Sequence, residues 1–556
     1  MHPVAAALAV LLLIPVATPE LDPAHLPLEQ GLAQQLEGLQ ADGLDGAVAA
    51  ARLASGWQAE RLGHSLAAAR VPHVESEGPT AALLALAAST GHPFDAQDPA
   101  AARLDDAPES LHVTLTAFID AFHALWLAAD AFYGPLAADD GALLTEGDEA
   151  LIQRLAAGDL PAALDPSQIL AARLAFLDAT MEVRSVLLED QEVLSWRTAQ
   201  PGIVQPPLVA LDLQGGDHTY RKESKVVLLL DAGGDDVYNN NAGGNIIHPL
   251  PSSWNCLPHQ VVGYWSMGRA AAAVDIGGGN DLYNPIAQDG GGGGCGITGA
   301  GYFGVGFLFD DLGNDRYNGE RRGMNGGAYR GGIGFLLDGF GNDRYYGGDV
   351  GANGGAGGVL FFTTEYVRAG GIGTLIDGQG TDRYHAWAQG VNGGAHMAGL
   401  GFLADLRGND QYRIVAGPAD GIRPMAFIEN ALTLAGMAPA ADATFGANGG
   451  GDIGGAGFLF DRRGDDLYVA GSNGANGGGS RGGSGFLYDV EGNDGYAAGG
   501  HGANGGGHAG TGLLWDAGGR DHYVDDLTSC TDCTVPAKGS AGFQIDVPGK
   551  LIRSPT

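Results

Sequence analysis

The fold is decided by the stretch Leu308-Phe309-Asp310-Asp311-Leu312-Gly313-Asn314-Asp315-Arg316-Tyr317. It consists of a short apolar run that ends in aspartate, a turn with glycine and asparagine, a second aspartate and a tyrosine. The same order returns in Leu336-Leu337-Asp338-Gly339-Phe340-Gly341-Asn342-Asp343-Arg344-Tyr345. Further copies end at Tyr238, Tyr384, Tyr412, Tyr468, Tyr496 and Tyr523, and a copy with one extra residue ends at Tyr283. This self-similarity predicts a repeat architecture.

The spacing of the aspartates that end the apolar runs gives the period. Asp310 and Asp338 are 28 residues apart, and so are Asp461 and Asp489. Longer gaps, such as the 39 residues from Asp338 to Asp377, indicate a coil with an insertion. A second marker, Asn-Gly-Gly, precedes the aspartate by 13 residues in most copies, at Asn325, Asn392, Asn448 and Asn476.

A unit of this size cannot bury its own apolar face, whereas stacked identical units can. Runs such as Gly457-Phe458-Leu459-Phe460-Asp461 have the length and composition of strands. We therefore predict parallel strands stacked about 4.8 Å apart, with one coil per repeat. Equivalent tyrosines, asparagines and aspartates would then form columns along the stack. Asparagine ladders favour such corners because side-chain amides can bond along the stack.

The expected fold class is α+β multidomain, with an N-terminal α-helical bundle followed by a parallel β-solenoid (β-helix) of 28-residue coils. Residues 19–200 form the predicted helical domain, because Leu32, Leu36 and Leu39 recur at helical spacing and only twelve of the 96 glycines precede residue 201. We expect this bundle at the start of the repeats. Residues 201–556 form the predicted glycine-rich solenoid, from a degenerate first copy at Asp212–Tyr220 to a truncated C-terminal cap at Gly542–Asp546.

The N-terminus predicts export. Residues 1–18 are interpreted as a signal peptide, because the apolar stretch from Val4 to Val16 is too short to span a bilayer and is followed by Ala17-Thr18-Pro19. We expect no membrane span in the mature chain and a secreted or cell-surface location. The four cysteines, Cys256, Cys295, Cys530 and Cys533, predict two disulfides, with three pairings possible. Cys530-Thr531-Asp532-Cys533 is also compatible with a redox motif or half of a zinc site.

Two stacked aspartate columns create an electrostatic problem. Like charges about 5 Å apart repel each other, and their pKa values rise unless something neutralises them. A divalent cation between coils would do so through carboxylate and carbonyl oxygens. Arg316, Arg344 and Arg383 offer another counter-charge, and turn capping through backbone hydrogen bonds is a third interpretation. The candidate metal ligands are Asp231, Asp236, Asp310, Asp315, Asp338, Asp343, Asp377, Asp382, Asp405, Asp410, Asp461, Asp466, Asp489, Asp494, Asp516 and Asp521.

The run Gly341-Asn342-Asp343-Arg344-Tyr345 resembles the glycine-rich nonapeptide of the hemolysin-type (RTX) calcium-binding β-rolls. The match covers Gly341, Asp343 and the bulky Tyr345, and the same positions in the other copies. The resemblance implies that the second aspartate of each copy ligates Ca²⁺ and that the bulky residue fills the core. Each 28-residue coil carries one match rather than tandem nonapeptides, which fits calcium at one corner of a solenoid.

The net charge is −36, from 65 acidic and 29 basic residues. Such a surface repels nucleic-acid phosphates and attracts divalent cations, so no nucleic-acid partner is expected. We expect an extracellular, calcium-assisted repeat scaffold for adhesion or for binding a cell-surface component, a matrix or a glycan.

The alternative is a β-helix polysaccharide lyase or glycoside hydrolase, a hypothesis that rests on fold analogy. No triad or metalloprotease motif supports it, so the sequence leans away from an enzyme and leaves the question open. Candidate residues in the insertions are His248, His259, Glu365, Tyr366, Arg368 and Glu429; those on the repeats are His385, His396, His501, His508 and His522. Trp254, Trp265 and Trp387 suit either sugar stacking or core packing.

Overall fold

The computed structural model describes residues 26–137, 165–199 and 202–546, apart from 222–224, 247–268, 285–295, 303, 320–321, 330, 349, 362–366, 387–388, 415–444, 472, 500–501, 526–528 and 532–541. The expected signal peptide, residues 1–18, lies outside the described residues.

Helices fill the first part of the described chain, and strands follow from residue 203 onward. The α-helices of the described residues are α2 (Leu26–Glu37), α3 (Gly43–Arg61), α4 (Pro79–Thr90), α5 (Pro99–Ala102), α6 (Glu109–Ala137), α9 (Ser167–Glu189) and α10 (Gln191–Arg197), and η2 (Leu66–Ala68) is a 3₁₀ turn. Asp190 caps α10, because its side chain accepts hydrogen bonds from the backbone N–H groups of Glu192 and Val193. The glycine distribution predicted this order, with helices first and strands after them.

The strands form four sheets. The first, which we call the helix-covered sheet, has twelve strands in the order β1 (Ile203–Gln205), β2 (Val209–Asp212), β4 (Leu228–Asp231), β7 (Ala270–Asp275), β10 (Val305–Asp310), β14 (Leu336–Asp338), β19 (Ile372–Asp377), β23 (Leu400–Asp405), β27 (Ala456–Asp461), β31 (Ser484–Asp489), β34 (Thr511–Asp516) and β37 (Gly542–Asp546). The second, the tyrosine sheet, has eleven in the order β3 (Thr219–Tyr220), β5 (Val237–Tyr238), β8 (Leu282–Tyr283), β11 (Arg316–Asn318), β15 (Arg344–Tyr346), β20 (Arg383–Ala386), β24 (Gln411–Ile414), β28 (Leu467–Gly471), β32 (Gly495–Gly499), β35 (His522–Asp525) and β36 (Ser529–Thr531).

Two smaller sheets complete the set. The third sheet comprises β12 (Arg322–Met324), β16 (Val350–Ala352), β21 (Gln389–Val391), β25 (Phe445–Ala447) and β29 (Asn473–Ala475). The fourth comprises β6 (Asn245–Ile246), β9 (Gly301–Tyr302), β13 (Ala328–Tyr329), β17 (Ala356–Phe361), β22 (Ala395–His396), β26 (Gly451–Asp452), β30 (Gly479–Ser480) and β33 (Gly507–His508), with β18 (Val367–Gly370) added to β17. Neighbours are parallel except in the pairs β1–β2, β17–β18 and β35–β36.

The chain visits the four sheets in turn and then returns one position further along each. One such circuit runs through β10, β11, β12 and β13 before β14 pairs with β10. Residues one period apart are in register, as Asp310 with Asp338 and Tyr317 with Tyr345. The predicted columns are therefore confirmed, and the arrangement is compatible with a parallel β-solenoid. The last strand, β37, continues the register, with Asp546 opposite Asp516.

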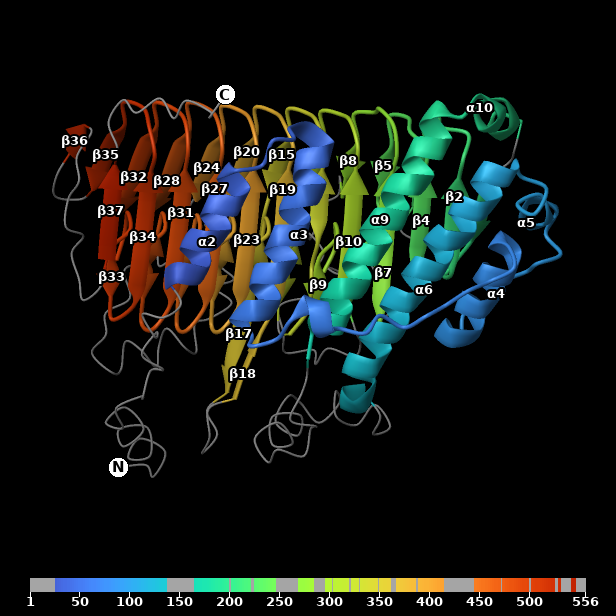
Figure 1. Ribbon diagram of the computed structural model, residues 1–556, viewed down its shortest axis with the longest axis horizontal. Helices are drawn as coiled ribbons and strands as arrows, with labels where there is room; N and C mark the ends of the chain where they lie inside the picture. Colours follow the sequence, from blue (N-terminus) through green and yellow to red (C-terminus); the bar gives the residue numbers. More distant parts are fainter. Residues whose placement is uncertain are drawn as a thin grey trace.

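The helix-covered sheet is buried on both faces. Side chains alternate along a strand, so in β27 Phe458 and Phe460 face one way while Leu459 and Asp461 face the other. The phenylalanines join one hydrophobic core with helices α2, α3, α4, α6 and α9. Figure 1 shows α2, α3, α6 and α9 lying across this sheet, with α4 beside α6. The helices thus extend along the repeats, which corrects the expected position at their start.

The interior carries a stack of ten tyrosines, one from each coil of the tyrosine sheet. Tyr345 and Tyr384 are typical, with ring centroids 4.8 Å apart and planes 2° from parallel. That separation matches the spacing of hydrogen-bonded strands. The inward leucines of the helix-covered sheet, such as Leu336 and Leu375, pack against this stack. Stacking of whole coils thus replaces the globular core that a single repeat could not form.

The Asn-Gly-Gly marker forms a corner of each coil. Asn325 and Gly326 have φ values of +49° and +68°, a left-handed conformation that asparagine and glycine tolerate best. Each asparagine also donates from Nδ2 to Oδ1 of the next one, for example from Asn325 to Asn353 at 2.9 Å and from Asn353 to Asn392 at 2.9 Å. The predicted asparagine ladder is confirmed.

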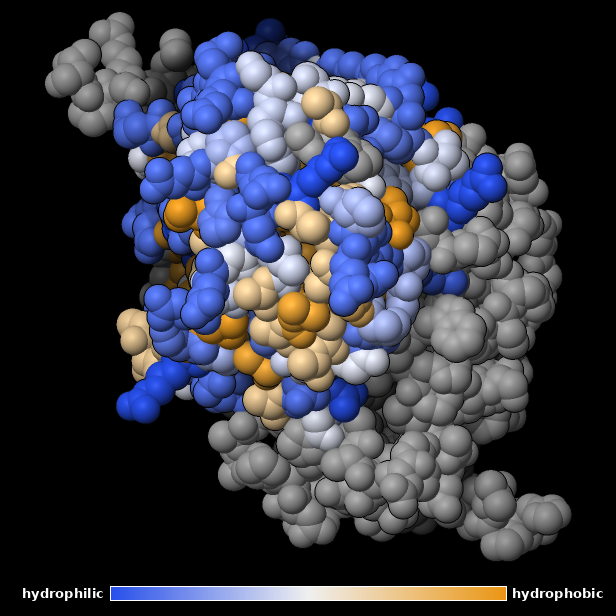
Figure 2. Space-filling model, turned by 90° about the vertical axis from the view of Figure 1, so that its right-hand side faces the viewer, coloured by the Kyte–Doolittle hydropathy of each residue, from blue (hydrophilic) through white to orange (hydrophobic). Residues whose placement is uncertain are grey.

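The coils begin at the end of the molecule that carries β1 and β2. Seen from this end, the described surface is mainly hydrophilic, with an apolar area near its centre (Figure 2). Of the described helices, Glu109–Gly134 is long and apolar enough to cross a bilayer, and 67% of its most apolar window is buried in the structure. A core helix meets the same criterion, and this segment packs against α9 and β7.

Candidate metal centre

The structure gathers the sixteen candidate aspartates into two columns at one corner of the coils. The first column holds the aspartates that end the strands of the helix-covered sheet, and the second holds those that precede the tyrosine sheet. In the first column, the register joins Asp231, Asp275, Asp310, Asp338, Asp377, Asp405, Asp461, Asp489 and Asp516. In the second, hydrogen bonds join Asp236, Asp281, Asp315, Asp343, Asp382, Asp410, Asp466, Asp494 and Asp521.

The two columns approach each other between successive coils. Asp315, Asp338 and Asp343 each place a carboxylate oxygen within 4.8 Å of the others. Asp343, Asp377 and Asp382 repeat this arrangement one coil further along. Both groups take one first-column aspartate and two second-column aspartates, and nine groups of potential metal ligands occur among the described residues. These buried acidic groups are able to hold a metal ion.

The second column uses one oxygen of each carboxylate to join neighbouring turns. The backbone N–H of Asp315 donates to Oδ1 of Asp343, and that of Asp343 donates to Oδ1 of Asp382 at 2.6 Å. Turn capping, one of the interpretations from sequence, is therefore present. It does not satisfy these groups, because the other oxygen has no hydrogen-bond partner among the described residues. The oxygens concerned are Oδ2 of Asp236, Asp315, Asp343, Asp382, Asp410, Asp466 and Asp494.

The first column is held by the tyrosine stack. The Tyr345 hydroxyl lies 2.8 Å from Oδ2 of both Asp338 and Asp377. The Tyr317 hydroxyl lies 2.7 Å from Oδ2 of both Asp310 and Asp338. A hydroxyl has one proton to donate, so it cannot donate to both of its carboxylates at once. In addition, Oδ1 of Asp310, Asp338, Asp461 and Asp489 has no hydrogen-bond partner among the described residues.

Burial and mutual repulsion both disfavour the charged form of these aspartates. Burial, reinforced by the charges of Asp338, Asp377 and Asp382, raises the pKa of Asp343 to about 12. Burial and the neighbouring Asp405 raise the pKa of Asp377 to about 8, although hydrogen bonds from two tyrosines lower it. Without a cation, the columns must therefore bind protons at neutral pH. Either protons or metal ions have to neutralise this corner.

Beside the second-column aspartates there is no room for a side chain, so the neighbouring position has to be glycine. A Cβ at Gly341 would lie 2.3 Å from Oδ2 of Asp343 and 2.3 Å from the carbonyl oxygen of Gly313 in the neighbouring coil. Two oxygens thus converge where another residue would place carbon. Carboxylate and carbonyl oxygens are the ligands that hard divalent cations prefer, so the chemistry of the donors fits such an ion.

The arginines next to the second column do not neutralise it. Arg316 lies on β11 beside Tyr317, and successive strand residues point to opposite faces. The tyrosine points inward to the carboxylates, whereas the guanidinium of Arg316 lies over the ring of Tyr346 and bonds to Asn318. Arg344 and Arg383 occupy the same register position and are exposed. The counter-charge expected from these arginines is therefore directed away from the columns.

Besides Asp212, which pairs in register with Asp231 at the start of the first column, three residues of the columns were not among the predicted ligands. Asp275 and Asp281 belong to the copy with an extra residue, and together with Asp236 they form a further group of the same kind. His218 occupies the second-column position of the degenerate first copy, two residues before Tyr220, and groups with Asp231 and Asp236. Alignment on the tyrosine would have found Asp281 and His218, each two residues before its tyrosine. Asp275 is displaced by the extra residue, because it lies eight residues before Tyr283 and not seven.

Most of the candidate catalytic and cysteine residues lie outside the described residues. These are His248, Trp254, Cys256, His259, Trp265, Cys295, Glu365, Tyr366, Trp387, Glu429, His501 and Cys533, while Arg368 and Cys530 lie on strands whose side chains there are not described. Their predicted roles stay predictions. His385, on β20, is packed edge-on against Tyr346.

One histidine of the repeats does meet charged partners. His396 Nδ1 lies 2.9 Å from Oδ2 of Asp452, and Arg481 Nη2 donates to the same oxygen at 2.6 Å. Ser480 donates to Oδ1 of Asp452. Burial raises the pKa of the Asp452 carboxyl, but the bonds to His396 and Arg481 outweigh it, so that the pKa is lowered overall. A single carboxylate that is ionised and saturated with donors is not the acid–base pair that glycoside hydrolysis uses, so this cluster holds strands together.

No family model matches the chain, and neither a curated protein nor a solved structure matches it significantly. The resemblance to the calcium-binding β-rolls therefore stays a prediction, and function is argued from the geometry of the columns.

Proposed function

We propose that the chain is a parallel β-solenoid whose coils are joined by Ca²⁺ ions, and that it serves outside the cell as a scaffold that binds a glycan or another surface component. The observation that carries this proposal is the repeated group of three buried carboxylates with unpartnered oxygens, exemplified by Asp315, Asp338 and Asp343. Oxygen ligands alone suit Ca²⁺ better than metals that prefer nitrogen or sulfur.

The charge balance of the corner supports a divalent cation. Each coil contributes one aspartate to each column, such as Asp338 and Asp343, so one divalent cation per coil neutralises the pair. Each group draws its carboxylates from two successive coils, as Asp315 comes from the coil before Asp338. A bound ion would therefore connect the coils and favour the stacked chain over the unfolded one.

A groove beside the second column supports a role in binding. It has a volume of about 830 Å³ and runs along the turns of six successive coils, from Gly278 to Gly464. Exposed amides follow it in a ladder: Asn314 Nδ2 donates to Asn280 Oδ1 at 3.0 Å, and Asn342 Nδ2 donates to Asn314 Oδ1 at 3.0 Å. A row of amides at strand spacing suits the repeated hydroxyls of an extended glycan, which is the partner proposed here.

The calcium proposal is tested by melting the full chain after metal removal, with Ca²⁺, with Mg²⁺ and with chelator. Because the ion binds only the folded chain, we expect stabilisation of about 2.7 kcal/mol for each site at a Ca²⁺ concentration one hundred times its dissociation constant. Equal melting temperatures with Ca²⁺ and with chelator, together with no heat of binding in calorimetry, would overturn it.

A matched pair of variants separates metal binding from hydrogen bonding. Asp343→Asn removes one charge from two adjacent groups, whereas Asp465→Asn changes an exposed aspartate of the outer ladder. We expect Asp343→Asn to reduce the stabilisation by Ca²⁺ while the metal-free chain becomes no less stable, because a neutral amide replaces a buried carboxyl that has to be protonated in the metal-free fold. Asp465→Asn should leave the response to Ca²⁺ unchanged.

Glycan binding is tested by co-sedimentation of the calcium-loaded chain with insoluble polysaccharides of neutral and of acidic type. Asn342→Leu interrupts the exposed ladder within the groove, and we expect it to weaken binding without changing the melt. Equal binding by the unaltered chain and by Asn342→Leu would show that the glycan does not bind in this groove. Release of reducing ends or unsaturated sugars would favour the lyase or hydrolase alternative.

A further inference from the structure

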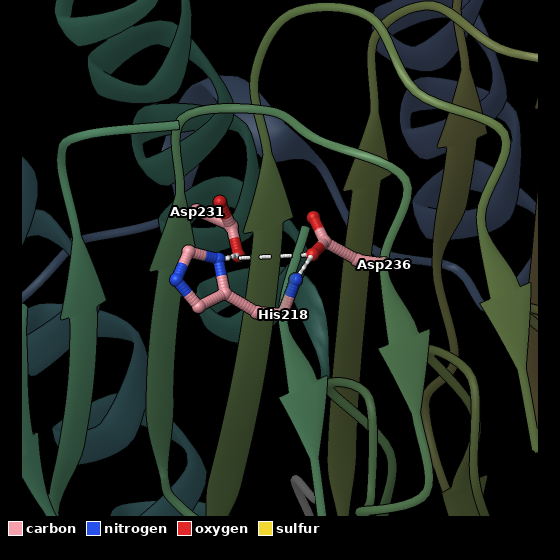
Figure 3. Close-up of side chains that lie close together, drawn as sticks. All are labelled: His218, Asp231 and Asp236. Atoms are coloured by element: carbon pink, nitrogen blue, oxygen red, sulfur yellow. Dashed lines mark hydrogen bonds and ion pairs between the residues drawn. The ribbon is translucent and has the colours of Figure 1, made fainter. Parts of the chain in front are cut away.

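The first group of the columns contains a histidine, whereas groups such as Asp315, Asp338 and Asp343 consist of aspartates alone. His218 stands at the second-column position in the first coil, so the group consists of an imidazole and the carboxylates of Asp231 and Asp236 (Figure 3). Its backbone N–H donates to Asp236 Oδ1, as the second-column aspartates do to their neighbours. The fold of the corner is therefore conserved while one oxygen donor is replaced by nitrogen.

A fourth residue orients the ring. Asp212, at the end of β2, places Oδ2 at 2.8 Å from His218 Nε2. A carboxylate accepts hydrogen bonds, so Nε2 carries the proton, and in the neutral ring Nδ1 is left unprotonated. Nδ1 then lies 3.9 Å from Asp231 Oδ2 and 3.8 Å from Asp236 Oδ1. Figure 3 shows Nδ1 turned toward both carboxylates.

Two further observations indicate a ligand at this point. His218 Nδ1 is buried and has no hydrogen-bond partner among the described residues, although 36% of the side chain is exposed. Asp236, which is 1% exposed, also keeps an oxygen without a partner among these residues. A histidine whose distal nitrogen bonds to a carboxylate while its other nitrogen faces two anionic oxygens has the arrangement of a metal ligand with its supporting residue.

The donor set separates this group from the interior ones. Ligand atoms of a tetrahedral site with arms of about 2.0–2.2 Å lie roughly 3.3–3.6 Å apart, close to the distances at His218. Imidazole favours Zn²⁺ and other late first-row metals, whereas carboxylates and carbonyls alone favour Ca²⁺ and Mg²⁺. We propose that His218, Asp231 and Asp236 form a Zn²⁺-type site at the end of the columns, with Asp212 as the positioning residue of the histidine.

The site sits where the columns start. The interior aspartates are at most 3% exposed, and His218 is the partly exposed member of its group. A metal bound here would neutralise the carboxylates of Asp231 and Asp236 at the coil where the second column begins with a histidine instead of an aspartate. This inference does not depend on calcium in the interior groups, because it rests on a different donor set.

The test is a titration of the untagged, full-length chain with Zn²⁺ in the presence of millimolar Ca²⁺, followed by calorimetry, with Co²⁺ as a spectroscopic probe. We expect one equivalent that resists Ca²⁺ competition and gives Co²⁺ absorption bands of tetrahedral intensity. His218→Asp restores the interior donor set, so it should fold while losing that equivalent. Asp212→Asn should weaken Zn²⁺ binding by about 10- to 100-fold.

The control is His73→Ala, since His73 lies on the surface, 85% exposed, and pairs with Glu75 alone among the described residues. It should leave the tight equivalent intact. The proposal is overturned if His218→Asp binds Zn²⁺ as tightly as the unaltered chain, or if Co²⁺ bound to the unaltered chain gives only octahedral bands. A tight, His218-dependent equivalent without any effect of Ca²⁺ on the melt would retain this site and reject calcium in the interior.

Discussion

Gly341 shows how single residues set the geometry of the metal corner. The space around it is closed by the carboxylate of Asp343 and by the backbone of the neighbouring coil. Its φ is not in the left-handed region, so glycine is needed for close approach and not for conformational freedom. In the Gly-Asn-Asp motif, the glycine thus leaves room that a carboxylate oxygen of the following aspartate occupies.

Gly341→Ala should therefore destabilise the chain and weaken its response to Ca²⁺. A methyl group 2.3 Å from two oxygens forces the turn apart, and such overpacking costs about 1–3 kcal/mol. Denaturant melts with and without Ca²⁺ measure both effects. Gly278→Ala is the matched control, because a Cβ there meets no atom within 4 Å, and its change should stay within about 0.5 kcal/mol. Equal losses in the two variants would contradict the steric argument.

Tyr345 tests the link between the tyrosine stack and the first column. Tyr345→Phe keeps the ring in the stack but removes the hydroxyl between Asp338 and Asp377. Leaving buried acceptors without that donor costs about 1–3 kcal/mol. The adjacent Tyr346→Phe is the control, since Tyr346 points to the opposite face and contacts His385. Urea unfolding of both variants gives the comparison, and similar midpoints would show that the hydroxyl ladder contributes nothing.

At the scale of elements, the sequence predicted the repeated strands well. The columns of Asp310, Tyr317 and Asn325 follow from spacing alone, because equal periods in a stack put equal residues in register. The copy ending at Tyr283 was harder, since an extra residue before Gly279 separates Asp275 and Asp281 by six residues and not five. The position of the helices was not predicted, although Phe458 and Phe460 carried a signal. A strand with apolar side chains on both faces needs a second layer over its outer face.

That second layer should unfold together with the strands. Phe176 on α9 packs edge-on against Phe307 of β10 with centroids 4.8 Å apart, and it is fully buried. We expect Phe176→Ala to cost about 3–5 kcal/mol. Leu84→Ala, at a 45% exposed position of α4, should cost far less. The helical circular dichroism and the tyrosine near-ultraviolet signal should be lost at the same temperature. Separate transitions would show that helices and coils are independent units.

At the scale of the whole molecule, the columns should make the metal-free chain less stable as the pH rises, while stabilisation by a metal ion increases. Burial raises the pKa of Asp310 to about 6 and that of Asp377 to about 8, and burial with neighbouring carboxylates raises that of Asp281 to about 9. A carboxyl whose pKa is higher in the folded chain than in the unfolded chain stabilises the fold below its unfolded pKa. That stability is lost as the pH rises through the folded pKa.

The metal-free chain should therefore be most stable near pH 4 and become less stable up to about pH 9, by roughly 1.4 kcal/mol per pH unit for each carboxyl that must remain protonated. Ca²⁺ competes with those protons, so its stabilising effect should grow over the same range. Melting temperatures recorded against pH, with chelator and with Ca²⁺, should diverge as the pH rises. Na⁺ at the same ionic strength controls for screening of the net charge of −36. Parallel curves would mean that protons alone neutralise the columns, because a bound ion must displace the protons that otherwise hold neighbouring coils together.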